Sequence, residues 1–123
     1  MKADVHLAKA ERMAATQAKL DPAIDWETIV ETCYMSAHHY ILAGTEWAGV
    51  SHLQNHLHSM NPTLLQQANA PTEVNAAWSK LEQLRAGNVY GAKTSGTASD
   101  DARASLQIID QWVLQQRANN VSP

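Results

Sequence analysis

Histidine gives this chain most of its scope for acid–base or metal chemistry, with six copies among 123 residues. His52 and His56 stand four positions apart, a spacing that places two zinc ligands on one face of a helix. The glutamate of the HExxH zinc-protease motif does not lie between them. The Glu-x-x-His spacing of di-iron bundles does not occur either. We therefore expect histidines that face solvent or an interface, with no metal and no other cofactor.

His38 and His39 lie within residues 32–45, a stretch without Asp, Glu, Lys or Arg. In a helix, His39 would share a face with Met35 and Leu42, whereas His38 would lie at the edge of the core stripe. One interpretation is a hydrogen-bonded histidine in the core or in an interface. The other is a general base, since imidazole titrates near neutral pH. Cys33, the lone cysteine, falls on the inward stripe, which predicts a small buried hydrophobe.

Arg85 is in helical register with three apolar residues that precede it, Val74, Trp78 and Leu81. Its guanidinium would therefore point towards the apolar side, where it needs partners, because breaking a buried ion pair costs roughly 3–5 kcal/mol. A carboxylate or the carbonyls at a helix end would satisfy it. The functional alternative is a contact with an anion or a phosphate, with Tyr90 beside it.

The amino-acid composition of the chain disfavours several classes of function. Nine basic and twelve acidic residues give a net charge of -3, which argues against a sequence-independent electrostatic grip on nucleic acid. A small local site for a nucleotide or an RNA loop remains open. The glycines form no phosphate-binding loop, and no Ser-His-Asp arrangement is recognisable. Stretch 32–45 is too short to span a bilayer and no signal peptide is evident, so we expect a cytoplasmic protein without a membrane anchor.

Helical periodicity dominates the chain, and no run of residues predicts a strand. The expected helices cover about 3–20, 26–43, 51–60, 72–85 and from about 99 onwards. Asp25 and Thr72 are the expected N-caps of the second and fourth of these helices. In the third helix, Leu53, Leu57 and Met60 are expected to point inward. Turn signals separate the helices at Asp21-Pro22, Gly44 and Gly49, Asn61-Pro62, Ala70-Pro71, Gly87 and 91–100. We predict one all-α domain over 1–123, an up-and-down bundle of four to five helices.

The expected helix 26–43 is apolar on two sides. Its core stripe comprises Trp26, Ile29, Val30, Cys33, Tyr34, Ala37 and Ile41. The other side carries Met35, His39 and Leu42. A helix with two apolar faces is either central in a bundle or shared with a second subunit. We take these three residues as a candidate dimer interface and keep the buried central helix as the alternative.

Taken in order, several segments resemble the HEPN family (higher eukaryotes and prokaryotes nucleotide-binding domain) over nearly the whole chain. They are Asp25-Trp26, the run 32–43 with its small, aromatic and histidine residues, Ser51-His52, the set Trp78, Leu81, Leu84 and Arg85, and Val89-Tyr90-Gly91. The resemblance implies a helical bundle that dimerises through its central helices. It also implies a role in toxin–antitoxin pairs, often beside a nucleotidyltransferase, or as a metal-independent ribonuclease.

Ribonucleases of the family carry an arginine followed, after four to six residues, by histidine. The corresponding positions after Arg85 hold Tyr90, Gly91 and Ala92, so this motif is absent. A tyrosine does not replace imidazole as a base at neutral pH. We therefore expect a non-catalytic dimeric module that binds a protein partner, a nucleotide or RNA near Arg85, Asn88 and Tyr90. The alternative is a ribonuclease with a rearranged site, in which His38, His39 or His52 supplies the imidazole and Arg85 the phosphate contact.

Overall fold

The computed structural model describes residues 2–52, 58–89 and 97–121. Its elements, in chain order, are α1 (Ala3–Ala18), α2 (Trp26–Trp47), the short 3-10 turn η1 (His58–Met60), α3 (Asn61–Gln67), α4 (Thr72–Leu84), the π turn η2 (Arg85–Val89) and α5 (Ala98–Val121). The described residues contain no strand, which confirms the all-α prediction. None of the helices in these ranges is both long enough and apolar enough to cross a bilayer.

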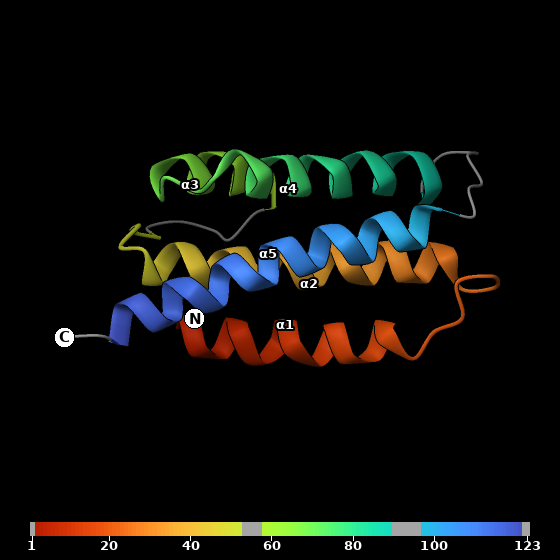
Figure 1. Ribbon diagram of the computed structural model, residues 1–123, viewed down its shortest axis with the longest axis horizontal. Helices are drawn as coiled ribbons and strands as arrows, with labels where there is room; N and C mark the ends of the chain where they lie inside the picture. The colour runs from red at the N-terminus through yellow and green to blue at the C-terminus, as the bar shows by residue number, and fades with distance from the viewer. Residues whose placement is uncertain (1, 53–57, 90–96, 122–123) are drawn as a thin grey trace.

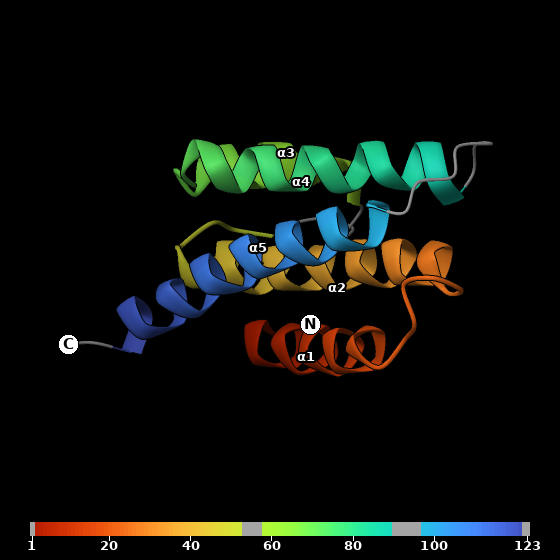
Figure 2. The same ribbon diagram turned by 45° about the vertical axis from the view of Figure 1, so that its right-hand side comes forward.

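The helices stack in three layers (Figure 1). Helices α2 and α5 form the middle layer, with α1 on one side and with α3 and α4 on the other, and a second view shows the same order (Figure 2). Helix α2 runs antiparallel to α1. Because it lies between the two outer layers, both of its apolar sides are covered within one chain.

The predicted core stripe of α2 is buried from Ile29 to Ile41, and only Trp26 at its start remains half-buried. Two close contacts fix α2 against its neighbours. A Cβ atom added at Gly44 would lie 2.8 Å from Val113 Cγ2 and 2.9 Å from Trp112 Cζ3, so side chains of α5 pack directly on the backbone of α2 there. The Ser36 hydroxyl donates to the backbone oxygen of Ala10 at 2.7 Å, which fixes α1 against α2.

The end of α2 corrects the predicted turn at Gly44. The helix continues for four residues beyond the expected end at 43 and stops at Trp47. Gly44 is needed for the approach of α5 and not for a turn. Gly49 has a φ of 94°, and the next N–H, from Val50, donates back to the Thr45 oxygen at 3.0 Å. This is the Schellman geometry that ends a helix at a left-handed residue.

The turn predicted at Asn61-Pro62 is also wrong, because α3 begins there. Proline lacks only the N–H group that the first turn of a helix leaves unused, so it fits this position. Of the helix expected over 51–60, only its last three residues are described as helical, whereas Leu53 and Leu57 fall outside the described residues. Met60 is 36% exposed, so its predicted inward position is wrong.

Three expected helix boundaries differ in detail. The chain does not leave the helix at Gly87 but widens into the π turn η2. Asp25 is the N-cap residue of α2 without a side-chain cap bond, and its carboxylate accepts instead from the Asp21 N–H at 3.1 Å. Thr72 is the first residue of α4, so the cap position falls on Pro71.

Candidate functional site

Polar side chains form a row along one face of α2. Glu31, His38 and Thr45 follow one another at intervals of seven residues, which is close to two helical turns and keeps them on the same face. Each contacts a polar side chain from a different segment of the chain: Arg85 of η2, Asn61 of α3 and His52 after α2. The candidate residues predicted from the sequence are therefore attached to one face of α2, but at separate points along it.

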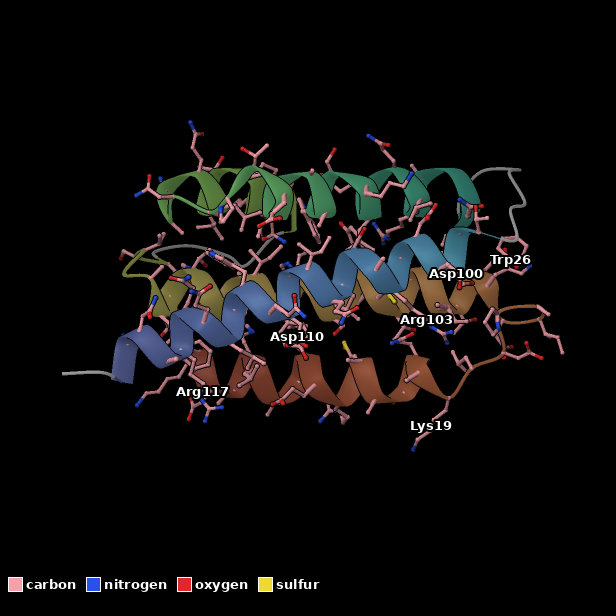
Figure 3. All side chains as sticks on the ribbon, in the orientation of Figure 1. Lys19, Trp26, Asp100, Arg103, Asp110 and Arg117 are labelled. Carbon is pink, nitrogen blue, oxygen red and sulfur yellow. The ribbon has the colours of Figure 1, made fainter. Side chains whose placement is uncertain are left out.

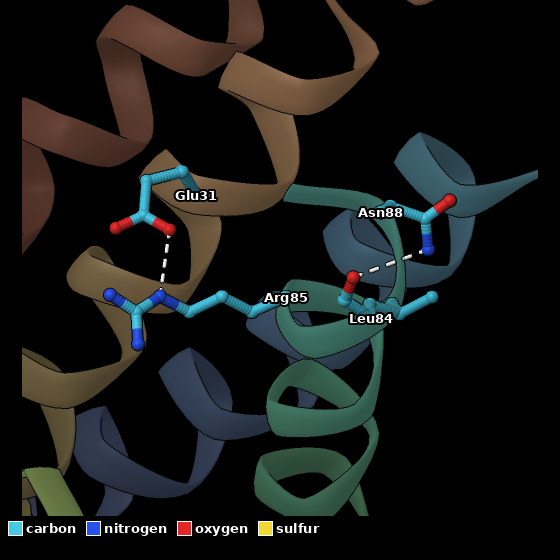
Figure 4. A network of polar contacts seen from close by, with 4 residues as sticks. All are labelled: Glu31, Leu84, Arg85 and Asn88. Atoms are coloured by element: carbon cyan, nitrogen blue, oxygen red, sulfur yellow. Dashed lines mark hydrogen bonds and ion pairs between the residues drawn. The ribbon is translucent and has the colours of Figure 1, made fainter. Parts of the chain in front are cut away.

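The first pair of the row joins Arg85 to Glu31 (Figure 4). The Arg85 Nε donates to Glu31 Oε2 at 2.7 Å, and the two side chains are 21% and 32% exposed. The guanidinium carbon lies 4.3 Å from the ring centre of Tyr34. Burial raises the pKa of Tyr34, an effect that the nearby Arg85 charge opposes. Arg85 thus has the carboxylate partner expected for an inward-facing arginine, while part of its head reaches the surface.

An aromatic stack and the π turn η2 hold the residues around Arg85 in place. Tyr34 stacks on the ring of Trp78, with 4.8 Å between ring centres. The amide Nδ2 of Asn88 donates to the Leu84 oxygen at 3.2 Å and so ties the widened turn (Figure 4). Asn88 is only 5% exposed, so its amide serves the turn and has little surface for the ligand role expected of it. Tyr90 lies outside the described residues.

The second and third pairs of the row engage two of the candidate catalytic histidines. His38 is 6% exposed, and its Nδ1 accepts from Asn61 Nδ2 at 3.1 Å. The Thr45 hydroxyl donates to the Ile41 oxygen at 2.7 Å and lies 2.9 Å from His52 Nε2. Since that hydroxyl has a single proton, His52 Nε2 must donate to it. Both imidazoles therefore act as internal structural partners.

His39 turns to the opposite layer and meets a histidine that the sequence interpretation missed. Its Nδ1 lies 3.0 Å from the Nδ1 of His6 on α1, and His6 is 1% exposed. The signal was present in the spacing, because Ala3, Leu7 and Ala10 surround position 6 in the inward register of α1. Nothing local in this alanine-rich helix gave a reason to pair His6 with a residue 33 positions away.

The face proposed for a dimer is covered within the chain. Leu42 is 0% exposed and His39 is 7% exposed, while Met35 is partly buried against the core. The alternative of a buried central helix accounts for these three residues without a second subunit. A homodimer stays a prediction, and these side chains would contribute to it only if the segments that cover them moved away.

A different arginine binds the helix-end carbonyls that were one option for Arg85. Arg103 of α5 reaches across to the end of α1 (Figure 3). Its Nε donates to Gln17 Oε1 at 2.7 Å, and its Nη2 donates to the backbone oxygens of Gln17 and Leu20 at 2.7 and 3.0 Å. Positive charge at the C-terminus of a helix also suits the helix dipole. Arg103 therefore closes α1 and fastens it to α5.

A buried polar contact also joins α2 to α5. The hydroxyl of Tyr40 hydrogen-bonds the carboxylate of Asp110, whose position on α5 is marked in Figure 3. Burial raises the pKa of Asp110, and the nearby Glu11 charge adds to that rise, whereas the Tyr40 hydrogen bond lowers it. Burial likewise raises the pKa of Tyr40. This contact lies inside the bundle and has a structural role.

The candidate groups are not assembled for acid–base catalysis on a phosphate. His38 lies two turns from Glu31 along α2, about 10 Å by helical rise, and His39 faces α1. His52 is attached two turns further on, at Thr45. Within residues 2–52, 58–89 and 97–121, no three His, Cys, Asp or Glu side chains are grouped so as to hold a metal ion. Arg85 is thus the candidate that has both a fixed orientation and some exposed surface.

No protein-family model, curated protein or solved structure matches this chain. The function is therefore argued from the geometry and from the resemblance described above.

Proposed function

We propose that the chain is a non-catalytic, HEPN-like helical module that binds the phosphate group of a nucleotide at Arg85. The observation that carries the proposal is the half-buried guanidinium, which Glu31 orients at 2.7 Å and which lies over Tyr34. Figure 4 shows one terminal nitrogen of Arg85 on the side of Glu31 and the other directed away from it. An arginine that is held in one orientation and is 21% exposed is suited to contact with phosphate oxygens.

The proposal includes no catalysis because the candidate histidines are already engaged by residues inside the bundle. Cleavage of RNA by acid–base chemistry requires an imidazole within hydrogen-bond reach of the reacting group, beside a group that stabilises the phosphate charge. His38 and His39 are buried and engaged by Asn61 and His6. A base at either position would have to give up its internal contact and move about two helical turns to reach a phosphate on Arg85.

The resemblance to the HEPN family supports the same proposal. It adds the expected assembly, a homodimer with a nucleotidyltransferase-type protein as a possible partner, in the cytoplasm. The net charge of -3 favours a small nucleotide over a long nucleic acid. The carboxylate of Glu31 next to Arg85 acts in the same direction, because it repels all but a well-placed phosphate.

Isothermal titration calorimetry with AMP and ATP tests the binding. We expect the Arg85→Gln variant to lose at least tenfold in affinity, and Arg117→Gln, which removes an exposed arginine of α5, to match the parent protein. Glu31→Gln should bind more tightly, since it keeps a hydrogen-bond acceptor but removes the competing charge. Circular dichroism would show that each variant is folded.

Two results would contradict the proposal. If neither nucleotide binds, or if Arg85→Gln binds as well as the parent protein, the site at Arg85 is wrong. A metal-free RNA degradation assay on the same proteins covers the other possibility. Cleavage by the parent protein that disappears in Arg85→Gln would favour the rearranged ribonuclease site instead.

A further inference from the structure

The contact between His6 and His39 stands apart from the Arg85 site, on the opposite side of α2. The two rings are stacked with centres 5.2 Å apart and planes at 25°. Their Nδ1 atoms are 3.0 Å apart, which is a hydrogen-bond distance. His6 is 1% exposed and His39 7% exposed. The contact joins the N-terminal half of α1 to the middle of α2.

This geometry limits how many protons the pair can hold. A hydrogen bond between two Nδ1 atoms needs a proton on one of them and a lone pair on the other, so the neutral rings must be in different tautomers. One added proton leaves that bond intact, because the charged ring still donates to its neighbour. A second added proton would place two N–H donors face to face and two positive charges about 3 Å apart. The folded pair therefore cannot take up both protons that two free imidazoles accept in acid.

The surroundings of the two histidines make binding of a second proton still less favourable. The ring of His38 lies 5.1 Å from that of His39, and it would add a third positive charge in acid. The charged side chains on the helices around the pair are Asp4, Lys9, Glu11 and Arg12 of α1, Glu27, Glu31 and Glu46 of α2, and Asp100, Asp101, Arg103, Asp110 and Arg117 of α5, with Lys2 just before α1. The buried titratable residues of α2 besides His39 are Cys33, Tyr34, His38 and Tyr40. Among the charged groups, the Asp110 carboxylate is already engaged by Tyr40. Asn61 of α3, which holds His38, carries no charge.

We propose that the His6–His39 contact is an acid-sensitive latch, which releases the N-terminal half of α1 from α2 when both rings become protonated. Opening must also break the hydrogen bond from Ser36 to the Ala10 oxygen, and release is confined to that half because the other end of α1 is held independently. Arg103 binds the carbonyls of Gln17 and Leu20, and its charge does not change over this pH range. Opening would uncover His39, one of the three residues that the sequence predicts to form a dimer interface.

Amide hydrogen exchange tests the latch on the intact chain. After correction for the intrinsic rate, exchange in residues 5–11 should rise between pH 7.5 and pH 5.0, by up to about tenfold per pH unit for each proton taken up below the imidazole range near 6.5. Exchange in residues 12–18 should change much less. In the double variant His6→Asn, His39→Asn, the pH dependence should disappear, because two amides can hydrogen-bond but do not titrate. His52→Asn, which changes a half-buried histidine away from the pair, is the matched control and should retain the pH dependence.

An unchanged exchange pattern in the parent protein between these pH values would overturn the proposal. So would a double variant that keeps the same pH dependence. If the double variant does not fold, nitrogen-15 NMR of the parent protein still decides the question. Different tautomers at His6 and His39 near pH 8, with protonation of the second ring coinciding with faster exchange in α1, would support the latch. Independent protonation of both rings in a helix that stays protected would exclude it.

Discussion

Replacing Arg103 with methionine should destabilise the chain more than any other arginine substitution on α5. Methionine keeps the apolar stem but removes three hydrogen bonds to the end of α1, of 2.7, 2.7 and 3.0 Å. A hydrogen bond to a charged group contributes about 1.5–3 kcal/mol. Water would replace part of this at the half-buried Leu20. We therefore expect a total loss of about 2–4 kcal/mol, which is smaller than the sum of three independent bonds.

Urea unfolding followed by circular dichroism measures this loss. For 123 residues, 1 kcal/mol corresponds to about 4 °C in Tm, so Arg103→Met should melt roughly 8–16 °C lower. Arg103→Lys should fall between the two proteins, because one ammonium group cannot reach all three oxygens. Arg117→Met is the control, since the exposed guanidinium of Arg117 lies 5.9 Å from the Trp47 ring and such a contact contributes under about 1 kcal/mol.

A double-mutant cycle with Gln17→Ala separates the side-chain bond from the backbone bonds. We expect Arg103 and Gln17 to be coupled by about 1 kcal/mol, with the remaining loss unchanged in the Gln17→Ala background. The reasoning would be refuted by an Arg103→Met protein whose free energy of unfolding lies within 0.5 kcal/mol (about 2 °C) of the parent value. It would also fail if Arg117→Met were equally destabilising.

Gly44→Val should lower the free energy of unfolding by about 2–3 kcal/mol in urea titrations, since even its Cβ would lie 2.8 Å from Val113; an unchanged midpoint would disprove that close approach. Burial raises the pKa of Cys33 to about 12, so at pH 8 Ellman's reagent should modify the thiol only as fast as the chain unfolds, and rapid labelling of the native protein would be inconsistent with this. Burial also raises the pKa of Asp110, so the folded chain binds this proton more readily than the unfolded chain does. Asp110→Asn should therefore be more stable than the parent protein at pH 7, by a difference that shrinks as the pH falls through the carboxyl range near 4, whereas Tyr40→Phe should be less stable at pH 7; thermal melts of both at pH 7 and pH 4 would show it.

The sequence was sufficient to predict the helices whose burial is periodic. The stripe from Ile29 to Ile41 is buried as its spacing predicts. Helix ends were less predictable where a residue has two possible uses. Gly44 permits either a turn or a close approach, and only the position of α5 decides between them. Asn61-Pro62 similarly fits a turn or the first turn of a helix.

The sequence predicts the type of a polar contact but not the partner residue. The register of Arg85 indicated an inward guanidinium that needs partners, either a carboxylate or helix-end carbonyls. Nothing local to it indicated Glu31, which is 54 positions away. The same holds for His6 and His39, whose contact depends on the antiparallel register of α1 and α2. Arg103 was missed for another reason, because its targets are mainly backbone oxygens, which any residue type offers.

The spacing of Glu31, His38 and Thr45 has a mechanical consequence. Three separate segments contact α2 at points two turns apart. A slide of α2 by one turn, or a rotation by one residue, would break all three contacts together. Any one segment, in contrast, can let go while the other two preserve the position of the helix. We therefore expect motions in which one covering segment at a time separates from α2. The central helix α2 should keep its register during these motions.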